Sequence, residues 1–184
     1  CTANLYKWEL TFCSLVRRTS IYRGRIVDLG LETIRRANGE LSTVEIVRLP
    51  GGAGIVALDQ EHRVCLLRQY RLAISRWIWE IPAGLMENNE APLTTAKREL
   101  REEAGLEAER WRSLGSILPA PGFCNEEIFL YEAQDITFVG SSPDIDEQFE
   151  IHWKPLAEAI NMASNGQISD SKTIVALFRA NQMG

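Results

Sequence analysis

The chain has 184 residues, of which 45% are hydrophobic and 24% are charged, which suits one compact domain with or without a small appendage. A formal net charge of -5 argues against nucleic acid or an anionic membrane as the partner of the whole protein. The longest uncharged stretch, 113–125, contains two prolines and is too short for a membrane span. Charged residues interrupt the first nineteen positions, so we expect no secretory signal and a cytoplasmic location.

The side chains able to bind metal favour oxygen ligands. The sequence contains 4 cysteines with no C-x-x-C pair and only 2 histidines, a pattern that does not predict a zinc site. Carboxylates are abundant, so a hard cation is the expected metal, Mg²⁺ first and Mn²⁺ as a substitute.

The N-terminal part is predicted to form a small antiparallel β unit. Extended segments within 21–49 are joined by a turn at Asn38-Gly39, and β-branched residues are dense in 43–47. A break at 50–52 then separates residues 1–49 from residues 50–184.

The rest of the chain mixes strands and helices. The apolar segments 53–58 and 63–68 predict a second hairpin in a core sheet, and further strands are expected at 127–133 and 149–153. The clearest helix begins near Pro92, has an apolar stripe over Leu93, Ala96, Leu100 and Ala104, and ends at Gly105. Helices are also expected at 155–164 and 171–181. Because βαβ alternation is absent, we predict a mixed α+β fold or an α/β/α sandwich.

Three glutamates on the first helix, Glu99, Glu102 and Glu103, have the spacing that places them on one side of it. A solvated acidic face is the simpler interpretation, because surface charges of this kind are common. Convergence on a metal is the alternative, since a hard cation needs several oxygen ligands and the preceding loop, 81–85, offers a backbone carbonyl.

The spacing of these residues resembles the signature of the Nudix hydrolases at every specified position: Gly84, Glu90, Arg98-Glu99-Leu100, Glu102-Glu103 and Gly105-Leu106. The resemblance implies the Nudix fold with a mixed central sheet and Mg²⁺-dependent attack of water on a phosphorus atom. It implies metal ligation by Glu99 and Glu103, with the Ala83 carbonyl and with Glu102 as a further ligand that also acts in catalysis. Structural roles are implied for Gly84, Glu90, Arg98 and Gly105.

Outside the signature, from about residue 22 to residue 179, the chain resembles the ADP-ribose pyrophosphatase branch of this family. The segments that carry this resemblance are 22–25, 38–39, 50–52, 68–71, 79–84, 119–123 and 172–174. The implied substrate is ADP-ribose, split into AMP and ribose 5-phosphate, or a related nucleoside diphosphate sugar such as GDP-mannose. A nucleotide-binding module without turnover is the alternative, and the intact glutamates favour catalysis.

Matching positions within this branch imply further roles. Arg71 corresponds to a phosphate-binding arginine, although an exposed strand arginine would look the same. Glu80 corresponds to an acidic residue close to the metals and the substrate, with a plain ion pair to Arg68 or Arg71 as the alternative. Glu147 aligns with the general base on a mobile acidic loop, followed by Glu150 or Asp146. Arg25 replaces a frequent aromatic residue and is expected to stack on the base.

The same resemblance implies a homodimer in which residues 1–49 reach over the partner's active site. Residues 21–49 are too few to bury a core of their own, so they must pack on another surface. Their own second domain would serve equally well, and the family favours the dimer.

Overall fold

The computed structural model describes residues 13–140 and 149–182. The chain divides into two compact units, Cys1–Leu49 with Ala120–Asn125, and Pro50–Pro119 with Glu126–Gly184. None of the helices within the described ranges is long and apolar enough to cross a membrane.

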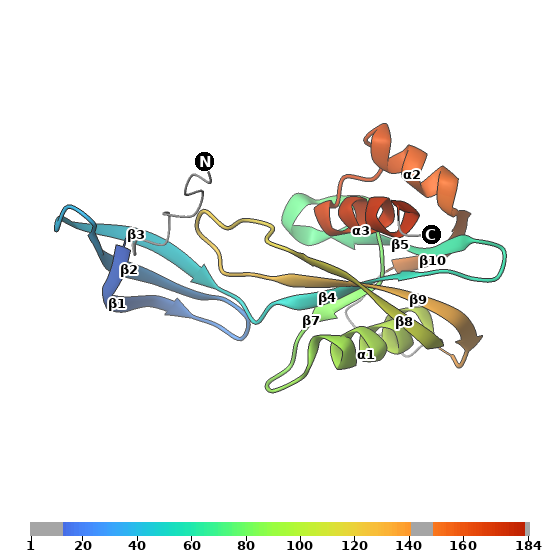
Figure 1. The fold of residues 1–184 in the computed structure, drawn as a ribbon, viewed down its shortest axis with the longest axis horizontal. Coiled ribbons are helices and arrows are strands. Elements are labelled where there is room, and N and C mark those ends of the chain that lie inside the picture. The colour runs from blue at the N-terminus through green and yellow to red at the C-terminus, as the bar shows by residue number, and fades with distance from the viewer. Residues whose placement is uncertain (1–12, 141–148, 183–184) are drawn as a thin grey trace, which may run out of the picture. The chain divides into compact units, whose positions relative to one another are not determined.

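The first unit is a three-stranded antiparallel sheet in the order β1-β2-β3, formed by Cys13–Arg23, Asp28–Arg36 and Leu41–Arg48 (Figure 1). The turn between β2 and β3 contains Gly39 at φ 86°, a conformation that glycine adopts without strain. The segment Ala120–Asn125 joins this unit because the Val47 amide donates to the Phe123 carbonyl at 2.8 Å. The sequence patterns predicted β2, β3 and their turn but not β1, whose pairing with β2 has two irregularities.

The second unit contains two sheets. The first is mixed and has the order β7-β4-β9-β8, formed by Ala83–Leu85, Gly52–Ala57, Ile128–Phe138 and Leu106–Ile117. β4 and β9 are parallel, and the other neighbours are antiparallel. The second sheet is antiparallel with the order β10-β5-β6, formed by Phe149–Pro155, Arg63–Arg71 and Arg76–Glu80. A short 3₁₀ helix, η1 (Leu72–Ile74), connects β5 to β6.

The predicted hairpin of 53–58 and 63–68 is wrong. β4 and β5 belong to different sheets, and they are joined only at their adjacent ends, by an isolated bridge between Leu58 and Val64 and by the Asp59 amide, which donates to the Arg63 carbonyl at 3.0 Å. Both edges of β4 are already paired, one with β7 and the other with β9. The segment 81–85, expected as a loop, includes β7, because its residues pair with one edge of β4.

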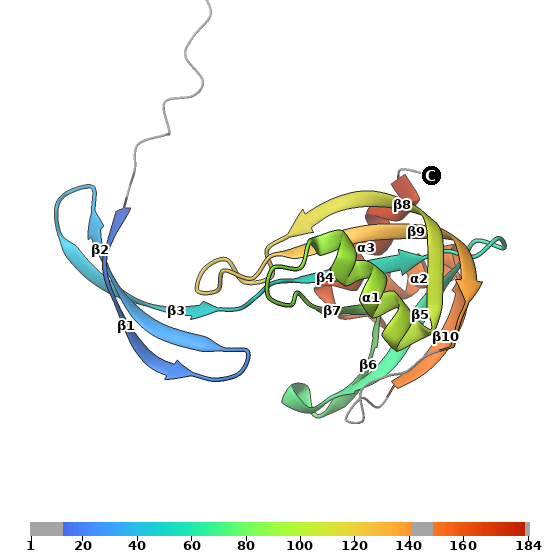
Figure 2. The same ribbon diagram turned by 90° about the horizontal axis from the view of Figure 1, so that it is seen from below.

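Helices of the described ranges lie on both sides of the mixed sheet, as an α/β/α sandwich requires (Figures 1 and 2). α1 (Pro92–Ala104) lies on one face, and α2 (Leu156–Ser164) and α3 (Ser171–Gln182) lie on the other. Gly105 caps the end of α1: its φ is 67° and its amide donates to the carbonyls of Leu100 and Arg101, which is the predicted left-handed cap.

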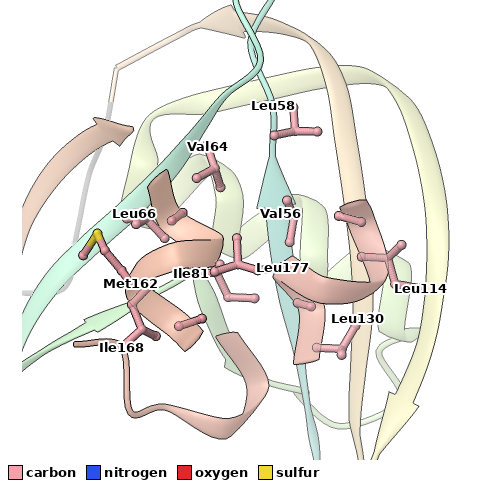
Figure 3. Close-up of a cluster of buried hydrophobic side chains, with 14 residues drawn as sticks. Val56, Leu58, Val64, Leu66, Ile81, Leu114, Leu130, Met162, Ile168 and Leu177 are labelled. Atoms are coloured by element: carbon pink, nitrogen blue, oxygen red, sulfur yellow. The ribbon is translucent and has the colours of Figure 1, made fainter. Parts of the chain in front are cut away.

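Each face of the sheet has its own apolar cluster. Beneath α1, the predicted stripe buries Ala96, Leu100 and Ala104 against Ala53 and Ile55. The cluster on the side of α2 and α3 is drawn in Figure 3, where its largest labelled members include Leu66, Ile81, Leu130, Met162, Ile168 and Leu177. Complete burial of such side chains is the main favourable term in folding. The two clusters therefore hold β4, β9 and α1 in fixed positions.

Candidate functional site

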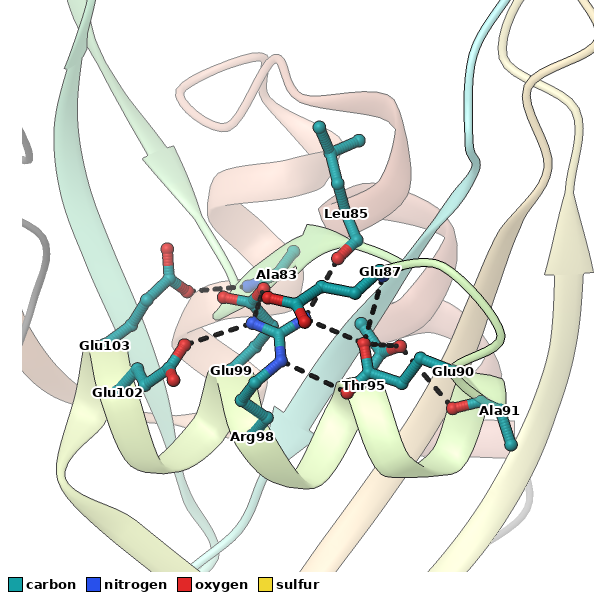
Figure 4. A network of polar contacts seen from close by, with 10 residues as sticks. All are labelled: Ala83, Leu85, Glu87, Glu90, Ala91, Thr95, Arg98, Glu99, Glu102 and Glu103. Atoms are coloured by element: carbon teal, nitrogen blue, oxygen red, sulfur yellow. Dashed lines mark hydrogen bonds and ion pairs between the residues drawn. The ribbon is translucent and has the colours of Figure 1, made fainter. Parts of the chain in front are cut away.

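Arg98 is the centre of a polar network between α1 and the segment before it (Figure 4). Its Nε and Nη2 atoms donate to Glu90 Oε1 and Oε2 at 3.1 and 3.0 Å, and Nη2 also donates to the Leu85 carbonyl at 3.0 Å. Nη1 donates to Glu99 Oε1 at 2.6 Å and to Glu102 Oε2 at 3.0 Å. One guanidinium thus ties the segment 85–90 to the helix.

Glu90 receives two more hydrogen bonds. The completely buried Thr95 hydroxyl donates to Glu90 Oε2 at 2.8 Å, and the Glu87 amide donates to the same oxygen at 3.2 Å. Hydrogen bonding by Arg98 first, then by these groups, outweighs burial and lowers the pKa of Glu90 to about 2. Thr95 was not predicted, because a threonine in the first turn of a helix is unremarkable in a sequence.

Glu99 and Glu103 point from α1 toward β7. A Cβ atom added to Gly84 would stand 2.0 Å from Glu99 Oε1, so only glycine leaves room for that carboxylate. The Ala83 amide donates to Glu103 Oε2 at 2.8 Å, and the Glu103 residue is only 3% exposed. Close packing of β7 on α1 therefore orients both carboxylates.

The three carboxylates of α1 suit a hard divalent cation by donor type, because all are oxygen ligands. Glu90, Glu99 and Glu102 all form ion pairs with the Arg98 guanidinium. Across the described ranges, 13–140 and 149–182, no three Asp, Glu, His or Cys side chains are gathered into a metal site. By donor type the residues fit the divalent metal that the resemblance implies, and binding would exchange Arg98 contacts of Glu99 and Glu102 for contacts with the cation.

A second charged cluster connects the antiparallel sheet with the start of α3. Arg71, at the end of β5, donates from Nε and Nη2 to the Glu80 carboxylate at 2.6 and 2.8 Å. Lys172, in the first turn of α3, also forms an ion pair with Glu80 and lies 3.1 Å from the Asp170 carboxylate. Burial opposes the ionisation of Glu80, but Arg71 and Lys172 outweigh it and lower the pKa of that carboxyl.

This cluster is close to the glutamates of α1. Hydrogen bonding to Glu80 is the main cause that raises the pKa of Arg71, and the charge of Glu103 contributes in the same direction. Arg71 is therefore within electrostatic reach of Glu103, while its side chain is 42% exposed. Arg68, the other expected partner of Glu80, lies beside Glu150 instead, with 3.6 Å between the charged atoms.

The sequence also predicts roles for Arg25, Glu147 and Asp146. Arg25 is an exposed residue between β1 and β2 of the first unit. Glu147 and Asp146 lie outside the described residues. Lys172 was not predicted as a site residue, and its only signal was its place in the segment 172–174 that resembles the ADP-ribose pyrophosphatase branch.

Comparisons with known proteins agree with this architecture. Residues 48–177 match the NUDIX domain family model. A methanol dehydrogenase activator of Bacillus methanolicus is 36% identical over 164 residues, and an ADP-ribose pyrophosphatase of Bacillus subtilis (strain 168) is 30% identical over 164 residues; each alignment covers 88% of this chain and 89% of the relative. A solved ADP compounds hydrolase has the same fold, with a TM-score of 0.82, 20% identity and 95% of both chains covered. The chain therefore belongs to the Nudix hydrolase family.

Proposed function

We propose that this protein hydrolyses the diphosphate bond of ADP-ribose or a related nucleoside diphosphate sugar, with Mg²⁺ as the metal. From ADP-ribose the products would be AMP and ribose 5-phosphate. The observation that carries the proposal is a chain of contacts: the half-exposed Arg71 guanidinium bonds Glu80, and Ala83, three residues after Glu80, donates its amide to the α1 carboxylate Glu103. The activity in the name of the Bacillus subtilis relative supports the same substrate class.

The proposed roles follow from the chemistry of each side chain: carboxylates bind the metal and a guanidinium binds phosphate. Glu99, Glu102 and Glu103 would hold Mg²⁺, or Mn²⁺ in its place, and the Ala83 carbonyl is the proposed backbone ligand. The bound cation would polarise the phosphorus–oxygen bond and lower the pKa of a bound water. A planar guanidinium matches two phosphate oxygens, so Arg71 is the proposed anchor for the diphosphate. Arg98 would orient Glu99 and Glu102 by its hydrogen bonds, and Gly84 would leave room for the Glu99 carboxylate beside β7.

Two further roles rest on the family resemblance. Glu147 is the proposed general base, because a base on a loop can close over a bound substrate. Arg25 is the proposed contact for the nucleobase, because a guanidinium plane stacks on aromatic rings. Residues 1–49 would then act as the unit that caps the substrate.

The test is release of phosphate from the products by a coupled phosphatase, with ADP-ribose, GDP-mannose and other nucleoside diphosphate sugars as substrates. We expect turnover of at least one of these compounds with Mg²⁺, weaker or altered turnover with Mn²⁺, and none after chelation by EDTA. A folded protein that is inert toward the whole panel with both metals would overturn the proposal and favour a binding module.

A further inference from the structure

Lys172 carries its charge in a place that a lysine seldom occupies. It belongs to the small set of buried polar residues, being 9% exposed, and the Glu80 residue that it contacts is 2% exposed. A lysine is almost never buried without a partner, because removing its charge from water is unfavourable. Its position therefore depends on the carboxylates of Glu80 and Asp170.

The two cations on Glu80 differ in their freedom to move. The Arg71 side chain is 42% exposed, whereas the Lys172 side chain is 11% exposed. The Arg71 side chain can therefore rotate toward solvent or toward a ligand without disturbing buried neighbours. Lys172 is held between two carboxylates and cannot follow it.

Hydrogen bonds connect the surroundings of Lys172 with the segment 81–85, which packs on α1. Asp170 Oδ2 accepts from the Thr173 amide at 3.0 Å and from its hydroxyl at 2.5 Å. The Thr173 hydroxyl in turn accepts from the Ile81 amide at 2.9 Å. Ile81 lies two residues before Ala83, whose amide orients Glu103. The start of α3 thus supports the strand end that carries Glu80.

A buried carboxylate that loses its only cation becomes an uncompensated charge, which strongly disfavours that state. If Arg71 were the sole partner of Glu80, turning toward a phosphate would leave Glu80 in this condition. The second cation removes that obstacle, because Glu80 Oε2 keeps an ion pair with Lys172 when Arg71 moves.

We propose that Lys172 is a positioning residue that holds the buried Glu80 carboxylate, so that Arg71 can exchange Glu80 for the diphosphate of a substrate. This inference rests on the proposed function, since it assumes a diphosphate substrate. Lys172 itself need not contact the substrate. Lys172 instead affects how readily Arg71 leaves Glu80 to bind the diphosphate.

The experiment compares steady-state kinetics of the full chain with Mg²⁺ and ADP-ribose for the wild type and for Lys172→Met. We expect KM to rise about tenfold or more, the scale of one charge-assisted hydrogen bond, while kcat changes less than about threefold. Lys172→Arg should restore KM to within about threefold of the wild type, because it keeps the charge. Lys154→Met is the matched control, since Lys154 is more exposed than Lys172 and pairs with the half-exposed Glu158, and both constants should stay unchanged.

The double variant Lys172→Met/Glu80→Gln separates positioning from folding. With a neutral amide at position 80, Arg71 leaves no buried charge behind, so KM should return toward the wild-type value. Thermal melts of all variants show whether they fold, and the double variant replaces Lys172→Met if the single variant does not fold.

An unchanged KM in folded Lys172→Met, or a drop confined to kcat, would overturn the proposal. A double variant with a still higher KM or no activity would overturn it as well, because Glu80 would then contact metal or substrate directly. A wild type that turns over none of the nucleoside diphosphate sugars would instead refute the proposed function, and the kinetics of the wild type alone show this.

Discussion

The Glu99 carboxylate lies against the bare Cα of Gly84, in the space that any other side chain would fill. The hypothetical Cβ would be 2.0 Å from Glu99 Oε1 and 2.1 Å from Glu99 Cδ. The same oxygen, Glu99 Oε1, accepts a hydrogen bond from Arg98 Nη1 at 2.6 Å, so moving it away from position 84 would disturb that bond. Glycine is thus required at position 84 by the Glu99 side chain, fifteen residues later, and not by a special backbone conformation.

Gly84→Ala is expected to displace the Glu99 carboxylate and reduce kcat/KM by about 100-fold or more, on the scale of losing an oriented metal ligand. Gly122→Ala is the control, because nothing lies within 4 Å of a Cβ placed there. Kinetics and thermal melts of both variants are the measurements. Equal activity of Gly84→Ala and the wild type would mean that Glu99 is not needed in this position.

Glu103→Gln tests whether the most buried of the α1 carboxylates holds the metal. The amide oxygen can still accept the hydrogen bond from Ala83, so we expect the fold to persist while activity falls by several orders of magnitude. Glu107→Gln, which alters only an exposed pair with Arg101, should behave as the wild type. Retention of more than about a tenth of the wild-type rate would remove Glu103 from the metal ligands.

Sequence patterns within a single segment predicted the part of the site that lies on α1. Pro92, the apolar stripe and Gly105 define α1, and the glutamate spacing defines its charged side. β8 was missed because charged residues at 107, 109, 110 and 112 disturb its alternation, although it pairs with β9 along most of its length.

Contacts between distant segments could not be predicted in this way. The parallel partner of β4 is β9, which follows only after β5, β6, β7, α1 and β8, and hairpin signals concern only neighbouring strands. Lys172 and Glu80 are 92 positions apart, and nothing in a sequence marks a lysine as buried until its carboxylate partners are in place. The charge network of the site depends on packing between layers.

Glu147→Gln addresses the general base. We expect kcat to fall by about 100-fold or more, within the usual range for a lost base, while the apparent affinities for Mg²⁺ and ADP-ribose stay nearly constant. Titration of activity against Mg²⁺ and substrate provides both values. A collapse of the Mg²⁺ affinity would make Glu147 a metal ligand instead, with Glu150 or Asp146 as the next candidates for the base.

The homodimer is tested by light scattering of the intact chain at micromolar concentration, where we expect twice the mass of one chain. Large apolar side chains of β1 are more than half exposed, including Leu15 at 53% and Ile21 at 57%, which gives the first unit an uncovered apolar surface. The variant Leu15→Glu/Ile21→Glu should shift the mass toward one chain, because charges are unfavourable in a buried interface. A wild type with the mass of a single chain would contradict the dimer.

Glu90 is expected to make the stability of the fold depend on acid pH. Its pKa is about 2 in the folded protein, against an ordinary value of 4.5, so the unfolded chain binds more protons between these values. The stabilisation is therefore complete above about pH 5 and is lost as the pH falls toward 2. The bond from Arg98 to ionised Glu90 is the main source of this effect.

Thermal melts of the wild type and of Glu90→Gln from pH 7 to pH 2 measure this contribution as a difference in Tm. We expect Glu90→Gln to melt roughly 5 °C lower at pH 7, for a loss of a few charge-assisted hydrogen bonds in a chain of this size, and the curves to converge near pH 2. Glu61→Gln is the control, because the Glu61 side chain is 74% exposed and its loss should leave the pH profile of the wild type intact. A Tm difference between the wild type and Glu90→Gln that stays constant down to pH 2 would show that the carboxylate charge is not what Arg98 stabilises.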